Sequence, residues 1–262
     1  MSEMASAGKE TTHGVAARLR ALTPARVALD RTGVSLPTRN LLDFQRCHAQ
    51  ARDAVHARLE TATLARTLGA IAGGSVFRLH SAAADRATYL QRPDLGRRLD
   101  DSSRKLLAER ARPGTVELVL IVADGLSALA VERHAAPLVE ELLAQLHGWK
   151  IGPVCVVEQG RVAIGDEIGQ SLGAQMIVVL IGERPGLSSP DSLGAYITWQ
   201  PQPSRTDAER NCISNIRAEG LSYQQAAAQI EMILSAARRE QRTGVALKVV
   251  APKTEAHQIK ER

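Results

Sequence analysis

The sequence has few of the residues that mark secreted, zinc-binding or nucleic-acid-binding proteins. Its 262 residues include three cysteines, Cys47, Cys155 and Cys212, without a C-x-x-C spacing, which argues against a disulfide framework or a zinc ribbon. Each cysteine is expected to be a small buried apolar residue. Aromatic residues make up only 3% of the chain, so few side chains can stack on bases, and we expect no nucleic-acid partner despite the net charge of +5.

Long apolar runs and an export signal are also missing. No run approaches the roughly 20 apolar residues that a membrane-spanning helix needs, so no membrane span is expected. The opening stretch, MSEMASAGKETTHG, is small and polar and lacks the basic start, apolar middle and cleavage site of a secretory signal. These absences predict a cytoplasmic protein.

The first part of the chain is predicted to be mostly helical. Residues 1–25 form a flexible N-terminal segment in which HGVAARLRALTPARV can form a short basic amphipathic helix. Residues 26–112 form a mostly helical region. It contains one helix with an apolar face over residues 40–68 and a second, polar-faced helical segment closed by Pro113-Gly114.

The pattern changes to alternating strands and helices over residues 113–262. Aliphatic runs in VELVLIVADGLS, GPVCVVEQG, AQMIVVLIGERPG and SLGAYITWQ predict four buried strands with helices between the first three. Capping boxes at Thr206–Glu209 and Ser222–Gln225 predict two final helices, DAERNCISNIRAEG and SYQQAAAQIEMILSAARREQ. The expected fold is α/β, a Rossmann-like, mainly parallel sheet with flanking helices, preceded by the smaller helical region.

The predicted strand ends carry the candidate binding residues, because ligands of open α/β sheets bind beyond the carboxyl ends of the strands. Asp124 follows the first strand, where it either caps the next helix or binds a ligand. Glu183 follows the third, where it forms either a surface pair with Arg184 or a ligand contact. Glycine-rich phosphate loops, a nucleophile elbow and H-E-x-x-H are absent, so we expect no catalytic residue on this chain.

Other charged and metal-ligating residues have simpler interpretations. Asp166 and Glu167 are expected on the solvated face of a short helix. His48 and His56 lie eight residues apart on one helical face, but they lack matched acidic neighbours, so we predict no metal site. The pair Arg97-Arg98 is either ordinary helix surface or a docking element.

Five fragments, taken in order, resemble a known family. RPDLGRRL, DGLS, GRVAIGDEIGQSLGA, GERPGLSSPDSLGAY and NCISNI together resemble the small (light) subunit of ethanolamine ammonia-lyase, over residues from about Thr23 to Leu247. The resemblance implies an adenosylcobalamin-dependent carbon–nitrogen lyase that converts ethanolamine to acetaldehyde and ammonia by a radical mechanism. It also implies a hetero-oligomer in which a large TIM-barrel subunit holds ethanolamine and the small subunit covers the cobalamin. The expected location of the protein is the cytoplasm, either free or inside a bacterial microcompartment.

The resemblance places three cobalamin contacts on this chain, at Val162, Glu183 and Cys212. The corrin is a broad, largely apolar ring fringed with amides, which suits an aliphatic side chain and a carboxylate acceptor. The D-x-H-x-x-G motif, which supplies a histidine to cobalt, is absent, so we expect cobalamin to keep its own dimethylbenzimidazole ligand. Two alternatives remain: a stand-alone Rossmann-like nucleotide-binding enzyme or module that uses Asp124 and Glu183, and a scaffold or shell-interaction protein.

Overall fold

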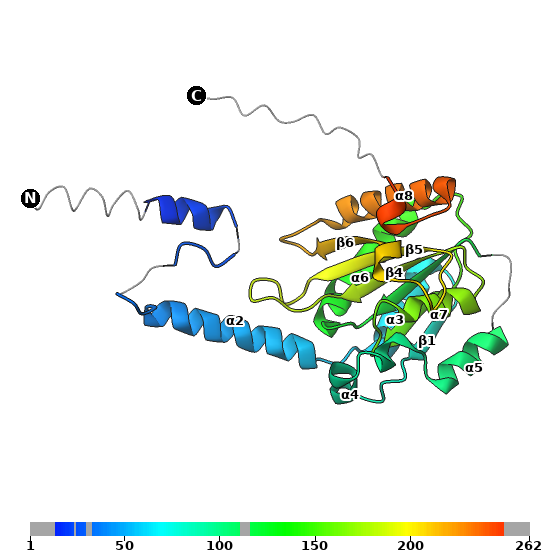
Figure 1. The fold of residues 1–262 in the computed structure, drawn as a ribbon, viewed down its shortest axis with the longest axis horizontal. Coiled ribbons are helices and arrows are strands. Elements are labelled where there is room, and N and C mark those ends of the chain that lie inside the picture. The colour runs from blue at the N-terminus through cyan, green and yellow to red at the C-terminus, as the bar shows by residue number, and fades with distance from the viewer. Residues whose placement is uncertain (1–13, 24, 30–32, 111–115, 249–262) are drawn as a thin grey trace, which may run out of the picture.

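The fold is organised around one six-stranded sheet. The computed structural model describes residues 14–23, 25–29, 33–110 and 116–248 (Figure 1). The strands are β1 (Val76–His80), β2 (Leu118–Ala123), β3 (Val154–Glu158), β4 (Met176–Gly182), β5 (Leu193–Trp199) and β6 (Arg210–Ile216). After a helix at residues 14–21, the helices are α2 (Thr38–His56), α3 (Thr61–Ala72), α4 (Arg86–Gln91), η1 (Leu95–Arg97), α5 (Asp101–Arg110), α6 (Ala128–Gln145), α7 (Ile164–Ser171), η2 (Asp207–Glu209), α8 (Tyr223–Glu240) and η3 (Gly244–Ala246).

The predicted α/β class is confirmed, but the sheet is mixed. Its strand order is β1-β3-β2-β4-β5-β6, and the pairs among β1, β2, β3 and β4 are parallel. β5 runs antiparallel to both β4 and β6, so the predicted parallel arrangement stops at β4. Because β5 reverses direction and β6 reverses it again, β6 runs the same way as β4. Leu193 pairs with both Gly182 and Ile216. The carboxyl ends of β4 and β6 therefore lie at the same end of the sheet.

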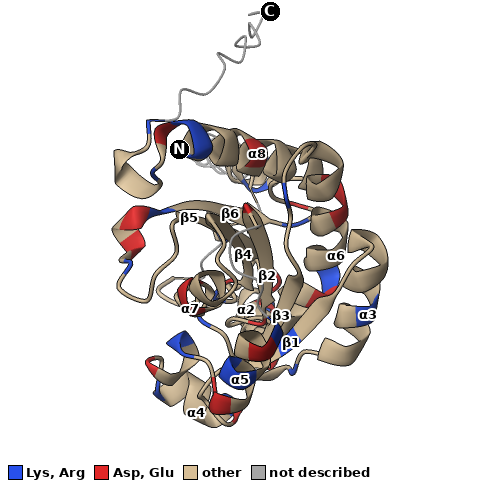
Figure 2. Ribbon diagram, turned by 90° about the vertical axis from the view of Figure 1, so that its right-hand side faces the viewer, with Lys and Arg blue, Asp and Glu red and all other residues tan. Residues whose placement is uncertain are grey.

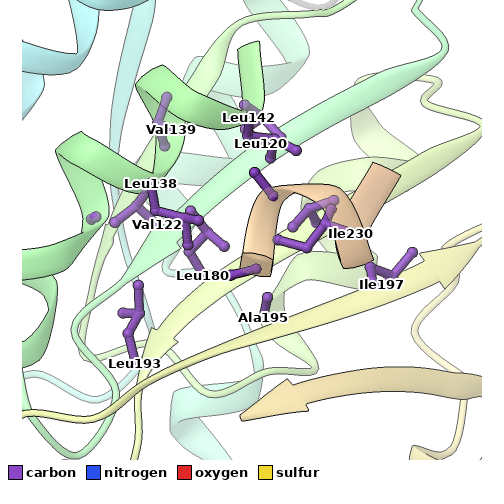
Figure 3. Packing of buried hydrophobic residues seen from close by; sticks show 14 of the residues in the cluster. Leu120, Val122, Leu138, Val139, Leu142, Leu180, Leu193, Ala195, Ile197 and Ile230 are labelled. Carbon is purple, nitrogen blue, oxygen red and sulfur yellow. The ribbon is translucent and has the colours of Figure 1, made fainter. Parts of the chain in front are cut away.

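Apolar layers cover both faces of the sheet. Alternate residues of β2 point to opposite sides, so Leu120 and Val122 face α3, α6 and α8, whereas Val119 and Ile121 face α5 and α7. Figure 2 shows these two groups of helices on opposite sides of the strands, and Figure 3 shows the packing against α6 and α8. The continuous aliphatic run of β2 is therefore explained by burial on both faces, as the sequence predicted.

The single helix predicted over residues 40–68 is wrong, because the chain breaks at residues 57–60 into α2 and α3. α3 packs on the core through Leu64 and Leu68, but α2 extends away from the sheet (Figure 1). Leu41 and Phe44, on the predicted apolar face of α2, are exposed. The exposed part of that face is its N-terminal half, whereas Val55 is partly buried and Leu59, just beyond α2, is buried in the core.

Two strands arise from segments predicted to be helical. β1 lies in the region predicted to be mostly helical and pairs with β3 at the edge of the sheet. β6 replaces the helix predicted for DAERNCISNIRAEG, because the segment pairs with β5 and buries Ile213 and Ile216 in the core. The Thr206–Glu209 capping box does form, but it caps only the single turn of η2.

The last predicted helix is confirmed as α8, which begins with the expected capping box between Ser222 and Gln225. Within the described ranges, no helix is both long and apolar enough to cross a membrane. Pro113-Gly114 and residues 1–13 lie outside the described residues, so the predicted end of the second helical segment and most of the N-terminal segment are not observed.

Candidate functional site

The carboxyl edge of the sheet carries two acidic residues in contrasting surroundings. Asp124 follows β2, and Glu183 follows β4 in the neighbouring position of the sheet. We call the region around Asp124 the closed end and the region around Glu183 the open end.

At the closed end, Asp124 is buried and lies beside a cation. Oδ1 accepts a hydrogen bond from the Gly160 N–H at 3.1 Å, and Oδ2 lies 3.6 Å from Nη1 of Arg86. Burial raises the pKa of Asp124 to about 6, although the backbone N–H groups of Gln159 and Gly160 and the Arg86 charge oppose the shift. Ser127 is the N-cap of α6, so Asp124 is neither the predicted cap nor an accessible ligand.

The side chain of Arg86, projecting from α4, fills the space next to Asp124. Its Nε donates to the Val55 carbonyl at 2.6 Å and its Nη1 to the Gly125 carbonyl at 2.8 Å, while the guanidinium lies 4.8 Å from the ring centre of Tyr89. Its Nη2 has no partner among the described residues. A Cβ on Gly125 would overlap the Gly182 carbonyl oxygen, so the loops after β2 and β4 touch each other. This crevice between strands is where a nucleotide would bind, and it is filled.

At the open end, Glu183 keeps an acceptor oxygen free. Its Oε2 accepts hydrogen bonds from the Ser192 hydroxyl and from the Asn215 N–H, the latter at 3.3 Å. Its Oε1 accepts no hydrogen bond from any residue that the structure describes. Arg184 forms no ion pair with Glu183 within the described ranges, so the surface pair predicted as one alternative is not observed. The carboxylate is therefore held by one oxygen and presents the other.

Beside Glu183, one face of β5 and β6 is accessible. Tyr196 on β5 is half-buried and pairs in register with Cys212 on β6, which is exposed, as is Ser214. The Cys212 Sγ lies 3.3 Å from the Ser214 Oγ. We call Glu183, Gly194, Tyr196, Cys212 and Ser214 the open platform. The expectation of a buried residue was wrong for Cys212 and for the half-buried Cys47, and right for Cys155.

Gly194 leaves the space that the Glu183 carboxylate occupies on the platform. A Cβ at Gly194 would lie 2.9 Å from Glu183 Oε1 and 3.3 Å from the ring of Tyr196. Separations this short are tighter than van der Waals contact, so only glycine leaves room for the carboxylate above β5. The platform therefore depends on the absence of a side chain at Gly194 as well as on the side chains of its other residues.

Val162 lies in the loop between β3 and α7, directly before that helix. Its partly buried side chain packs against the same apolar cluster as Tyr196, which places both on the α7 side of the sheet. The structure thus brings Glu183 and Cys212 together around Tyr196 and places Val162 on the same side of the sheet.

The structure also adds residues that the sequence did not reveal. Asp166, predicted to be solvated, is fully buried and accepts two hydrogen bonds of 2.7 Å from Arg210, which joins α7 to β6. Glu167 is also mostly covered and pairs with Arg104 at 2.6 Å. Spacing along the chain gives no signal for these pairs, since each joins segments more than 40 residues apart.

The remaining candidates lie away from the platform. His48 stacks on Phe44, with ring centres 6.0 Å apart on α2. No group of three or more His, Cys, Asp or Glu residues within the described ranges could hold a metal ion. Arg97 lies in η1, and with Arg98 it lines a polar surface hollow beside α7.

Known proteins match this chain over nearly all of its described residues. Residues 14–248 match the family described as "Ethanolamine ammonia-lyase light chain (EutC)". Proteins named ethanolamine ammonia-lyase small subunit are 60% identical in Pseudomonas fluorescens (strain Pf0-1), covering 88% of this chain and 85% of that protein, and 57% identical in Ralstonia nicotianae, covering 89% and 87%. With this match and these identities over most of both chains, the chain belongs to the ethanolamine ammonia-lyase light-chain family.

Proposed function

We propose that this chain is the adenosylcobalamin-binding small subunit of ethanolamine ammonia-lyase. In this proposal Val162, Glu183 and Cys212 contact the cofactor, and a large TIM-barrel subunit holds ethanolamine on the opposite side. When bound, adenosylcobalamin supplies the radical chemistry that converts ethanolamine to acetaldehyde and ammonia. This chain contributes binding and orientation, and it carries no catalytic residue of its own.

The residues at the open end fit a corrin. The free Oε1 of Glu183 is an acceptor suited to the amide N–H groups at the rim of the ring. The half-buried Tyr196 and exposed Cys212 form an accessible surface on which a flat apolar group can pack. Val162 packs against the same apolar cluster as Tyr196, so both lie on the side of the sheet that carries the platform. A nucleotide at the closed end is disfavoured, because Arg86 occupies that space.

The observation that carries the proposal is the free Glu183 oxygen on an accessible platform in a chain of this family. The test is cyanocobalamin binding to the co-expressed complex of this chain with a large subunit, with wild-type chain compared with Glu183→Gln. Loss of a hydrogen bond to a charged group costs roughly 1.5–3 kcal/mol, so we expect cobalamin to bind about ten- to a hundredfold more weakly.

The matched control is Glu231→Gln on α8, whose carboxylate accepts a hydrogen bond from the Ser235 hydroxyl and lies outside the platform. It should leave the affinity unchanged. A complex that assembles but does not bind cobalamin, or a Glu183→Gln complex with wild-type affinity, would contradict the proposal.

We also propose that cobalamin keeps dimethylbenzimidazole as its lower ligand, since the chain lacks D-x-H-x-x-G. Electron spin resonance of the reduced complex containing nitrogen-15 histidine tests this, and a splitting from histidine would contradict it. We propose a cytoplasmic location, either free or inside a microcompartment. Fluorescent tagging in a host with and without shell proteins distinguishes these, and a tagged complex found outside the cytoplasm would contradict both.

A further inference from the structure

Arg217 lies immediately after β6 and is almost completely buried. Its Nε donates to the Asn215 side-chain oxygen at 2.9 Å, and its Nη1 donates to the Ser188 carbonyl at 3.1 Å. The same Nη1 lies 3.2 Å from the carboxylate of Glu219, which is 74% exposed. One guanidinium therefore joins the end of β6 to the loop that follows β4.

Both segments joined by Arg217 hold the Glu183 carboxylate. The loop after β4 carries Glu183 itself and Ser192, whose hydroxyl donates to Oε2. The end of β6 carries Asn215, whose N–H donates to the same oxygen. Within the described ranges, no hydrogen bond or ion pair joins Arg217 to Glu183, so its influence on a ligand would pass through these donors.

The backbone of Asn215 is in an uncommon conformation. Its φ of 62° is in the left-handed region, which asparagine adopts more readily than other non-glycine residues. The hydrogen bond from Arg217 to the Asn215 side chain holds the residue in this conformation. In this conformation the Asn215 N–H points at Glu183.

Two donors on one oxygen determine where the other oxygen lies. The terminal torsion of a glutamate side chain is broad, so a carboxylate held by Ser192 alone could rotate. With Asn215 as a second donor, Oε2 stays in place and Oε1 stays over Gly194. Loss of Arg217 should therefore free the carboxylate without removing it.

We propose that Arg217 is a positioning residue that holds the free oxygen of Glu183 in the orientation needed to bind the cofactor. This inference rests on the proposed function. It assigns to Arg217 a role in affinity that operates through Asn215 and the loop after β4.

A double-mutant cycle tests this role. Cyanocobalamin affinity is measured for co-expressed complexes carrying wild-type chain, Arg217→Ala, Glu183→Gln, or both substitutions. We expect Arg217→Ala to weaken binding roughly tenfold in the wild-type background, the loss of about one charged hydrogen bond, and less than about twofold in the Glu183→Gln background. Equal effects in both backgrounds would show that Arg217 acts independently of Glu183 and would overturn the inference.

A conservative variant separates positioning from general stability. Arg217→Lys keeps a positive charge, but a single ammonium cannot reproduce the planar fork that reaches both Asn215 and Ser188. We expect its melting temperature to lie closer to the wild-type value than that of Arg217→Ala, with cobalamin affinity still reduced. If Arg217→Ala does not fold, the cycle is completed with Arg217→Lys, and wild-type affinity in that variant would overturn the inference.

The matched arginine control is Arg238→Ala on α8, which pairs with Glu117 and covers Trp149 away from the platform. It should leave cobalamin affinity unchanged. The two proposals fail in different ways. If the wild-type complex does not bind cobalamin, the proposed function fails. If Glu183→Gln weakens binding but Arg217→Ala does not, only the role of Arg217 fails.

Discussion

The closed and open ends of the sheet both place an acid directly after a buried parallel strand, yet the two acids have different uses. Asp124 is 2% exposed, faces Arg86 and accepts a backbone hydrogen bond. Glu183 is held through one oxygen and leaves the other free. The difference shows that an acid at a strand end can bind a ligand only where the fold leaves one of its acceptors accessible and without a neighbouring cation.

The reason for the difference lies in the residues contributed from elsewhere. The closed end receives a guanidinium from α4, a helix before the central strands, and its charge and bulk fill the crevice. The open end receives a backbone N–H from the end of β6 and no opposing cation within the described ranges. Because a backbone N–H brings no side chain into the site, it orients the Glu183 carboxylate and leaves it accessible.

The largest expected effect comes from Arg86→Ala at the closed end. The substitution leaves the Asp124 carboxylate buried without its cation, and breaking such a pair costs roughly 3–5 kcal/mol. Hydrogen–deuterium exchange in the loop after β2, measured in the complex with the large subunit, should show this loss. Arg133→Ala is the control, since its ion pair with Asp191 is solvent-exposed on the arginine side and should contribute less than about 1 kcal/mol. Equal protection of this loop from exchange in Arg86→Ala and Arg133→Ala would show that the closed end does not depend on the buried pair.

The next effect is expected at the open end from Gly194→Ala. The new Cβ would lie 2.9 Å from Glu183 Oε1, and the carboxylate, as the end of a flexible side chain, should move away. We expect cobalamin affinity to fall about tenfold, the equivalent of one lost charged hydrogen bond, while the melting temperature changes little. Calorimetric binding and thermal unfolding of the same complex measure both quantities. Unchanged affinity would indicate that Glu183 binds no ligand in its observed position.

The last prediction is a pH dependence that should distinguish the closed end. The pKa of Asp124 is raised by burial from its ordinary value of 3.8 to about 6. Between these values the folded state binds the proton more tightly than the unfolded state, so the Asp124 contribution to the free energy of unfolding falls as pH rises from about 4 to 6. In Asp124→Asn this contribution is absent. The melting temperature of the wild type, relative to Asp124→Asn, should therefore decline over this range, and a constant difference would contradict the raised pKa.

Much of the central sheet could be predicted from the sequence, because periodicity reports local burial. The aliphatic runs of β2, β3 and β4 are buried on both faces and mark strands directly. β6 could not be predicted in this way. Its sequence, RNCISNI, exposes Cys212 and Ser214 on one face and becomes a strand only by pairing with β5.

The candidate site was predictable only in part, for a similar reason. The location of Glu183 at the carboxyl end of a strand follows from the pattern of the chain, whereas its free oxygen depends on Ser192 and Asn215. Asp124 and Asp166 were misassigned because their partners, Arg86 and Arg210, are distant in sequence. The likeness of local motifs to a family located the candidate residues, and three-dimensional contacts determined what each can do.

The order in which the two ends are completed follows from their positions along the chain. The pair between Arg86 and Asp124, with the N–H of Gly160, needs no residue beyond 160. The open platform needs Asn215, more than 50 residues later. Because synthesis runs from the N-terminus and folding can begin before the chain is complete, both members of the buried pair are available for folding before the ribosome has delivered the last group that orients Glu183.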